Sequence, residues 1–279
     1  MALLAFSTNA FKKNTLEEAI EAIARIGYRG VEIMADVPHA HPSKMDGPRI
    51  ADLRRRLAEL NLAVSNINAF THFADGDTYH PTWIEPDAKR RQVRIDHTLR
   101  CIELASALGS STISLQPGGP LIGTGLSRQT AGDLFADGLR AVLPAAQQQG
   151  IVLAIEPEPG LFIESADEYA SFKRQYFADE PLVRMNCDIG HLFCVGDDPA
   201  DVIRRLPQEV AHVHLEDIGA NRVHQHLVPG KGAIDFPSLF AALDDVGYKG
   251  WVTVELYPFE TTAAGVAEAA YRVLCAAGR

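Results

Sequence analysis

IVLAIEPEPGLFIESADEYASFKRQYFADEPLVRMNCDIGH (residues 151–191) contains the pattern that decides the fold of this chain. It starts with a short apolar run rich in β-branched residues, continues through a stretch of helical spacing, and ends in a second apolar run at 183–188. Apolar runs of this length without polar alternation are typical of parallel strands buried on both faces. The stretch therefore predicts a strand, a helix and a second, parallel strand.

The same alternation extends along the whole chain. We expect eight strands, at 3–7, 30–34, 62–68, 111–116, 151–156, 183–188, 211–216 and 250–256. We expect helices after them, at 15–26, 46–60, 87–108, 128–149, 165–177, 199–206, 236–246 and 261–277. Eight such units in 279 residues predict an α/β protein with a single (β/α)8 TIM barrel domain over residues 1–279, its active site at the C-terminal ends of the strands. An open, doubly wound sheet is the alternative, but no glycine-rich phosphate fingerprint follows the first strand.

Composition narrows the class of function. Asp and Glu total 36 against 26 Lys and Arg, and this acidic balance disfavours a nucleic-acid partner. No apolar stretch is long enough to span a bilayer, so no membrane partner is expected. The four cysteines lie far apart without a CxxC pair, and the lysines of the first residues follow the apolar run, the reverse of a signal peptide. We therefore expect a soluble cytoplasmic protein.

Four residues with metal-binding side chains stand at the ends of four successive predicted strands. They are Glu156 in LAIEPEPG, Asp188 in NCDIGH, His214 in HVHLED and Glu255 in VTVELY. A single carboxylate at a strand end is commonly a helix cap or a solvated loop residue, but the barrel would bring all four to one mouth. Three carboxylates and one imidazole suit Mn²⁺, Mg²⁺ or Co²⁺, and Zn²⁺ is also compatible.

The set IEP, CDIGH, HVHLED and TVEL resembles the xylose isomerase-like TIM barrel superfamily, which includes ketose 3-epimerases, hydroxypyruvate isomerase, inosose dehydratase and, more distantly, endonuclease IV. The resemblance implies one divalent ion, Mn²⁺ foremost, bound by Glu156, Asp188, His214 and Glu255. It makes Glu156 and Glu255 the catalytic acid/base pair as well. The implied function is a metal-dependent sugar isomerase or epimerase that transfers a proton through a metal-stabilised enediolate.

Further residues are predicted to contact a small sugar or sugar phosphate. His191 and His226 match histidines of the family, and Arg222 resembles an arginine that several members aim at substrate hydroxyls. Glu158 and His72 follow predicted strands and are added as candidates from their position. Plainer roles stay open for Arg222 as a solvated loop residue and for Glu158 as a brace of its loop.

The resemblance leaves the reaction open. A dehydratase or lyase acting on a keto-sugar or keto-inositol shares the first proton abstraction and is the main alternative. A phosphodiesterase related to endonuclease IV would need more metal ligands, and Gln116 ends the fourth strand where another histidine would be required. A non-catalytic sugar-binding barrel is disfavoured because both carboxylates of the acid/base pair are present. A homo-oligomer is compatible with the family.

Overall fold

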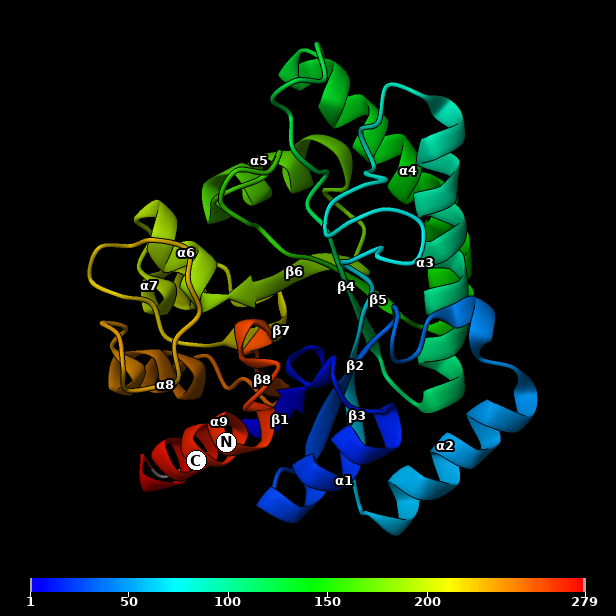
Figure 1. Ribbon diagram of the computed structural model, residues 1–279. Helices are drawn as coiled ribbons and strands as arrows, with labels where there is room; N and C mark the ends of the chain where they lie inside the picture. Colours follow the sequence, from blue (N-terminus) through cyan, green and yellow to red (C-terminus); the bar gives the residue numbers. More distant parts are fainter. Residues whose placement is uncertain (1, 278–279) are drawn as a thin grey trace.

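A computed structural model describes residues 2–277, and its strands form one closed barrel (Figure 1). Each strand pairs in parallel with the next, and β8 pairs with β1, which confirms the predicted (β/α)8 fold. The outermost positions of the predicted domain, residues 1 and 278–279, lie outside the described part of the chain. The strands are β1 (Leu3–Ser7), β2 (Gly30–Met34), β3 (Ala63–Asn68), β4 (Thr112–Leu115), β5 (Val152–Ile155), β6 (Val183–Asp188), β7 (Val210–Leu215) and β8 (Trp251–Val254).

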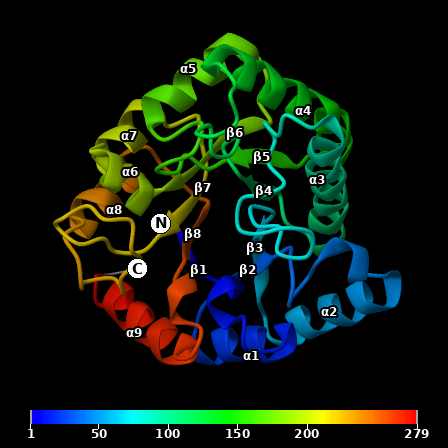
Figure 2. The ribbon, with the colours of Figure 1, turned by 45° about the horizontal axis from the view of Figure 1, so that its top comes forward.

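Helices surround the barrel as an outer ring, and α9 packs beside α1 where the ring closes (Figure 2). In the described residues no helix combines the length and apolar character needed to cross a membrane. The α-helices are α1 (Leu16–Ile26), α2 (Gly47–Glu59), α3 (Ala88–Leu108), α4 (Arg128–Gln149), α5 (Ala166–Tyr176), α6 (Ile189–Val195), α7 (Pro199–Arg205), α8 (Phe236–Asp245) and α9 (Ala263–Ala276), and the short 3-10 helices are η1 (Thr8–Phe11), η2 (Pro42–Lys44) and η3 (Tyr257–Phe259).

Helix α1 shows how local sequence sets the boundaries of these elements. The Thr15 side chain accepts a hydrogen bond from the backbone N–H of Glu18, and the Glu18 carboxylate accepts one from the backbone N–H of Thr15. This capping box satisfies two of the N–H groups that have no partner within the helix. The helix ends at Gly27, whose φ of 117° is a conformation that glycine adopts at low cost.

Helix α6 was not predicted, although its boundaries are encoded locally. Asp188 ends β6 and also caps α6, because its Oδ1 atom accepts a hydrogen bond 2.8 Å long from the backbone N–H of His191. Gly196, with φ of 98°, ends the helix after only seven residues. A helix this short has too little periodicity to be recognised. It nevertheless places His191 in the first turn after the end of β6.

Several polar side chains inside the barrel are hydrogen-bonded to one another. The hydroxyls of Ser65 and Thr253 are 3.2 Å apart, and the Asn66 amide donates to Oγ of Ser114 at 2.9 Å. The same amide donates to Oε2 of Glu32, also at 2.9 Å. Because these groups are buried, their hydrogen bonds offset the cost of removing them from water. The network ends at Glu32, whose Oε2 atom lies 2.6 Å from Nε2 of His214.

Candidate active site

The structure brings the four predicted metal ligands together at the mouth of the barrel. One ligand atom of each lies within 4.8 Å of the corresponding atoms of the others, and all four side chains are buried. The His214 Nδ1 atom is 3.3 Å from Oε1 of Glu156 and 3.7 Å from Oδ2 of Asp188. It is also 3.7 Å from Oε1 of Glu255. Parallel pairing explains part of this convergence, because Asp188 and His214 face each other in the register of β6 and β7.

Glu32 determines which nitrogen of His214 faces the cluster. Its Oε2 atom lies 2.6 Å from His214 Nε2 and 3.5 Å from His212 Nε2. Burial raises the pKa of Glu32, but the charges and hydrogen bonds of His214 and His212 together outweigh burial and hold that pKa well below its usual range. A carboxylate that accepts the Nε2–H of a histidine leaves Nδ1 with its lone pair free for a metal. His212, two residues before His214 on β7, is also buried.

The charge of the cluster fits a divalent cation. Carboxylates of Glu32, Glu156, Asp188 and Glu255 surround a single imidazole, and burial raises the pKa values of Glu156 and Glu255. Burial lowers the pKa of His214, yet the surrounding carboxylates raise it well above its usual value. Each of these shifts favours a less negative cluster, and a bound divalent cation would neutralise the same charge.

Asp188 supplies a second observation in favour of a metal. Its Oδ1 atom caps α6, whereas its buried Oδ2 atom accepts no hydrogen bond from an amide, hydroxyl or imidazole of residues 2–277, and the nearby Glu216 carboxyl has its pKa raised by burial and by Asp188. A buried carboxylate oxygen without a partner is costly unless a cation contacts it. Oδ2 is also the Asp188 oxygen that lies 3.7 Å from Nδ1 of His214, inside the cluster.

Three asparagines that the sequence analysis did not single out orient the two glutamates. Asn9 and Asn68 donate to Oε1 of Glu255 at 2.8 and 3.3 Å, and Asn186 donates to Oε2 of Glu156 at 2.7 Å. The sequence contained a signal for two of them, because asparagines occur within the mostly buried strands β3 (AVSNIN) and β6 (VRMNCD). A buried amide needs partners, and here those partners are the carboxylates at the mouth.

A cavity of about 250 Å³ opens beside Glu156 and Glu255, which is a volume suited to a small sugar. Glu158 and His191, two of the predicted substrate contacts, line it. The Tyr79 hydroxyl donates to Oε1 of Glu158 at 3.0 Å, and burial raises the pKa of Glu158 well above its usual value. The other lining residues are Asn9, Lys12, Met34, Asn68, Phe70, Thr71, Phe73, Thr78, Tyr79, His224 and Tyr257.

Two predicted substrate contacts, His72 and Arg222, do not line this cavity in the structure. The ring of His72, on the loop that follows β3, packs against that of His97 on α3, with centroids 4.4 Å apart. The Arg222 guanidinium lies over the ring of Phe193, 4.3 Å from its centroid, and donates to the Phe193 carbonyl at 2.7 Å. The sequence placed both residues on mouth loops correctly, but the direction of a loop side chain depends on neighbours that the sequence does not identify.

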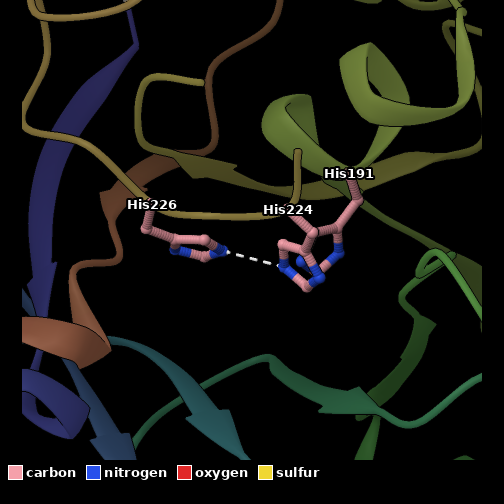
Figure 3. A group of neighbouring side chains, drawn as sticks. All are labelled: His191, His224 and His226. Carbon is pink, nitrogen blue, oxygen red and sulfur yellow. Dashed lines mark hydrogen bonds between the residues drawn. The ribbon is translucent and has the colours of Figure 1, made fainter. Parts of the chain in front are cut away.

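His226 is not one of the residues that line this cavity, but it lies next to His191 and His224, which do line it (Figure 3). Its Nδ1 atom is 3.0 Å from the carbonyl oxygen of Glu255 and its ring lies 4.6 Å from that of Tyr257. The structure thus brings His226 beside the cluster, together with His224, which the sequence analysis had not included among the substrate contacts.

The closed barrel and the carboxylate–histidine cluster at its strand ends define a TIM-barrel enzyme with a candidate metal centre. The model of the xylose isomerase-like TIM barrel family matches residues 20–276, and the chain belongs to this family.

Relatives within the family differ in the reaction that they catalyse. The chain is 27% identical over 261 residues to inosose dehydratase of Clostridium beijerinckii, covering 88% of this chain and 83% of that protein. It is 26% identical over 263 residues to 2-oxo-tetronate isomerase of Cupriavidus necator, covering 92% of each. The crystal structure of the IolI protein with a bound zinc atom shares the fold, with a TM-score of 0.79 at 17% identity over 98% of this chain and 96% of that one.

Proposed function

We propose that this chain is a divalent-metal-dependent isomerase or epimerase of a small sugar. It would remove a proton from the carbon atom next to the carbonyl group and return a proton either to a neighbouring atom or to the opposite face of the same carbon. The observation that carries the proposal is the pair Glu156 and Glu255. These carboxylates come from β5 and β8, border the same cavity, and are each held by asparagine amides. Two carboxylates positioned around one substrate allow one to accept a proton while the other donates one.

Glu156, Asp188, His214 and Glu255 would hold the metal, for which Mn²⁺ is our first candidate. When bound, such a cation polarises a substrate carbonyl and stabilises the charge that develops on its oxygen. The protein contributes the rest. Amide donors fix the carboxylate rotamers, and burial raises the pKa values of Glu156 and Glu255 above their usual range.

The lining of the cavity favours an uncharged sugar over a sugar phosphate. Lys12 is the only lysine or arginine among the described residues that line it, and its Nζ atom is paired with Oε1 of Glu260 at 2.7 Å. Phosphate recognition commonly uses several unpaired cationic or backbone donors. Aromatic faces of Phe70, Phe73 and Tyr257 instead offer apolar surface to the carbon skeleton of a sugar.

A dehydratase is the second candidate, and Glu158 is the residue that favours it. Its buried carboxyl group lies in the cavity, and burial raises its pKa well above the usual value, which favours the protonated form. A protonated carboxyl can donate a proton to a departing hydroxyl group. The similarity to inosose dehydratase supports the same alternative.

Solvent deuterium exchange distinguishes these reactions. The protein would be incubated in D₂O with Mn²⁺ and a panel of keto-sugars, a keto-inositol and sugar phosphates, with and without chelator. We expect chelator-sensitive deuterium incorporation beside the carbonyl, observed by NMR, together with an isomer or epimer of one uncharged substrate. Loss of water from the substrate would replace the isomerase by the dehydratase. Absence of exchange and of any product on the whole panel, with metal bound, would contradict both.

A further inference from the structure

We propose that Arg94 and Asp36 are positioning residues that hold residues 69–81 as a preformed wall of the active-site cavity, and that Tyr79 on this wall determines which sugar binds. The segment is the first part of the loop between β3 and α3 (cyan, beside α3 in Figure 2). None of the four predicted metal ligands lies on it. The residues of the segment that line the cavity are Phe70, Thr71, Phe73, Thr78 and Tyr79.

Arg94 lies on α3, and its fully buried side chain is bonded to both ends of the segment. Its Nη1 atom donates to the carbonyl oxygens of Ala69 and Phe70, at 3.1 and 2.9 Å. Its Nε atom donates to the carbonyl oxygen of Pro81 at 2.8 Å, and its Nη2 atom donates to that of Tyr79 at 3.4 Å. Because the guanidinium carries five N–H groups in fixed directions, one side chain joins the beginning of the segment to its end.

The charge of Arg94 strengthens these four bonds. Burial lowers the pKa of Arg94 to about 10, which still leaves the guanidinium protonated at neutral pH. A buried cation is costly unless its donors are satisfied, and here backbone carbonyls accept all four of its hydrogen bonds. Hydrogen bonds from a charged donor are roughly twice as strong as those between neutral groups. The segment therefore supplies the acceptors that Arg94 requires, and Arg94 fixes the segment.

Asp36, which follows β2 and is also fully buried, holds the middle of the same segment. Its Oδ2 atom accepts hydrogen bonds from Oγ1 of Thr71 at 2.9 Å and from the backbone N–H of Phe73 at 2.5 Å. Its Oδ1 atom accepts one from the backbone N–H of Ala74 at 3.2 Å. Residues 73–77 are exposed, so little apolar packing holds them in place. The buried anion and the buried cation therefore carry most of the attachment of the segment.

Tyr79 is the residue whose position depends most directly on this arrangement. Its carbonyl oxygen accepts from Arg94 and also from Nε2 of Gln116, at 2.8 Å, so its backbone is fixed by two donors. Its hydroxyl donates to Oε1 of Glu158 at 3.0 Å, and both side chains line the cavity. A fixed donor and acceptor beside the substrate reject a sugar whose hydroxyl groups cannot bond to them. We therefore assign the choice of sugar to this pair.

Amide hydrogen exchange, followed by mass spectrometry on the whole protein, tests the positioning without turnover. Arg94→Met keeps a long side chain but removes every donor. Peptides covering residues 69–81 should then exchange at least about 10-fold faster, while peptides of β5 to β8 keep the wild-type rate. Asp36→Asn should show the same local pattern. Arg100→Met, which replaces an exposed arginine of the same helix, should match the wild type.

Arg94→Lys provides a second test, which remains available if Arg94→Met does not fold. Lysine keeps the charge but concentrates its donors on one nitrogen, which cannot reach carbonyls at both ends of the segment as a guanidinium does. Exchange of residues 69–81 should therefore lie between those of the wild type and Arg94→Met. Metal binding should be unchanged in each variant, because the segment holds none of the four predicted ligands.

Steady-state kinetics test the choice of sugar, and this part of the inference rests on the proposed function. Tyr79→Phe should raise KM for the sugar identified by solvent deuterium exchange about 10-fold and change kcat by less than about threefold, because the acid/base pair stays in place. Its hydrogen exchange should remain that of the wild type, because the backbone bonds of Tyr79 are kept. Arg94→Met should raise KM similarly, and Arg94→Lys should recover part of the loss.

The outcomes separate this inference from the proposed function. Wild-type exchange of residues 69–81 in both Arg94→Met and Arg94→Lys would overturn the positioning role. An unchanged KM in Tyr79→Phe would overturn the assignment of sugar choice to Tyr79. Faster local exchange in the Arg94 variants, together with a wild type that converts no sugar of the panel, would contradict the proposed function and support the positioning role, because the exchange measurement needs no substrate.

Discussion

The Nε2 atom of His214 lies 2.6 Å from Oε2 of Glu32, and both side chains are fully buried inside the barrel. Glu32 also accepts hydrogen bonds from Ser7 and Asn66, at 2.7 and 2.9 Å, which fix its own carboxylate. The pair therefore holds the imidazole with Nδ1 toward the mouth. Outer carboxylates of this kind commonly tune the affinity of a metal site as strongly as a change of ligand would.

Replacing Glu32 should weaken metal binding without removing any ligand. Glu32→Gln keeps the shape of the side chain but removes the charge that stabilises the Nε2–H of His214. We expect the Kd for Mn²⁺ to rise about 10- to 100-fold, measured by competition with a chelator. Glu21→Gln, which removes an exposed carboxylate paired with Arg56 on the outer ring, should leave that Kd unchanged. Equal affinities for wild type and Glu32→Gln would show that Glu32 has no part in the site.

Glu156→Gln and Glu255→Gln should each reduce kcat by at least about 100-fold, because each removes one member of the acid/base pair. Both glutamines can accept the asparagine hydrogen bonds, so the fold should survive; circular dichroism and the thermal midpoint check this. Metal content measured on the same samples separates lost proton transfer from lost metal. Full activity in either variant with metal bound would contradict the assigned mechanism.

His191 and Arg222 were both predicted to contact the substrate, but of the two only His191 lines the cavity in the structure. His191→Asn should raise KM or lower kcat, because His191 lines the cavity beside Glu156. Arg222→Ala should change kcat/KM by no more than about twofold, because its guanidinium lies on Phe193. Steady-state kinetics on the substrate identified by deuterium exchange would decide this. A large loss in Arg222→Ala would mean that the loop reorganises when substrate binds.

His72 should make stability depend on pH. Burial and, secondly, the nearby charge of Arg94 lower its pKa from the usual 6.5 to about 4. As pH falls below 6.5, the unfolded chain takes up a proton that the folded chain refuses, so stability present above 6.5 is lost toward pH 4. His72→Gln should lose stability less steeply over this window in urea unfolding. His80→Gln, an exposed histidine on the same loop, should follow the wild type.

The sequence alone determined the fold and the four residues at the centre of the site. Runs such as 151–156 and 183–188 are typical of strands buried on both faces, and eight of them with helices between leave few arrangements other than a barrel. Once the barrel is given, Asp188 and His214 must meet, because parallel strands bring their C-terminal ends to one mouth. These features follow from periodicity and chain direction, which are local properties.

The tertiary structure decided the direction of the loop side chains and the partners of buried polar groups. His72 and Arg222 lie on mouth loops, yet one packs against His97 and the other against Phe193. Asn9 reaches Glu255 across 246 positions of the sequence, a contact that no local pattern encodes. Loop conformation and long-range hydrogen bonds depend on which groups remain without partners after the barrel has closed, so only the folded chain determines them.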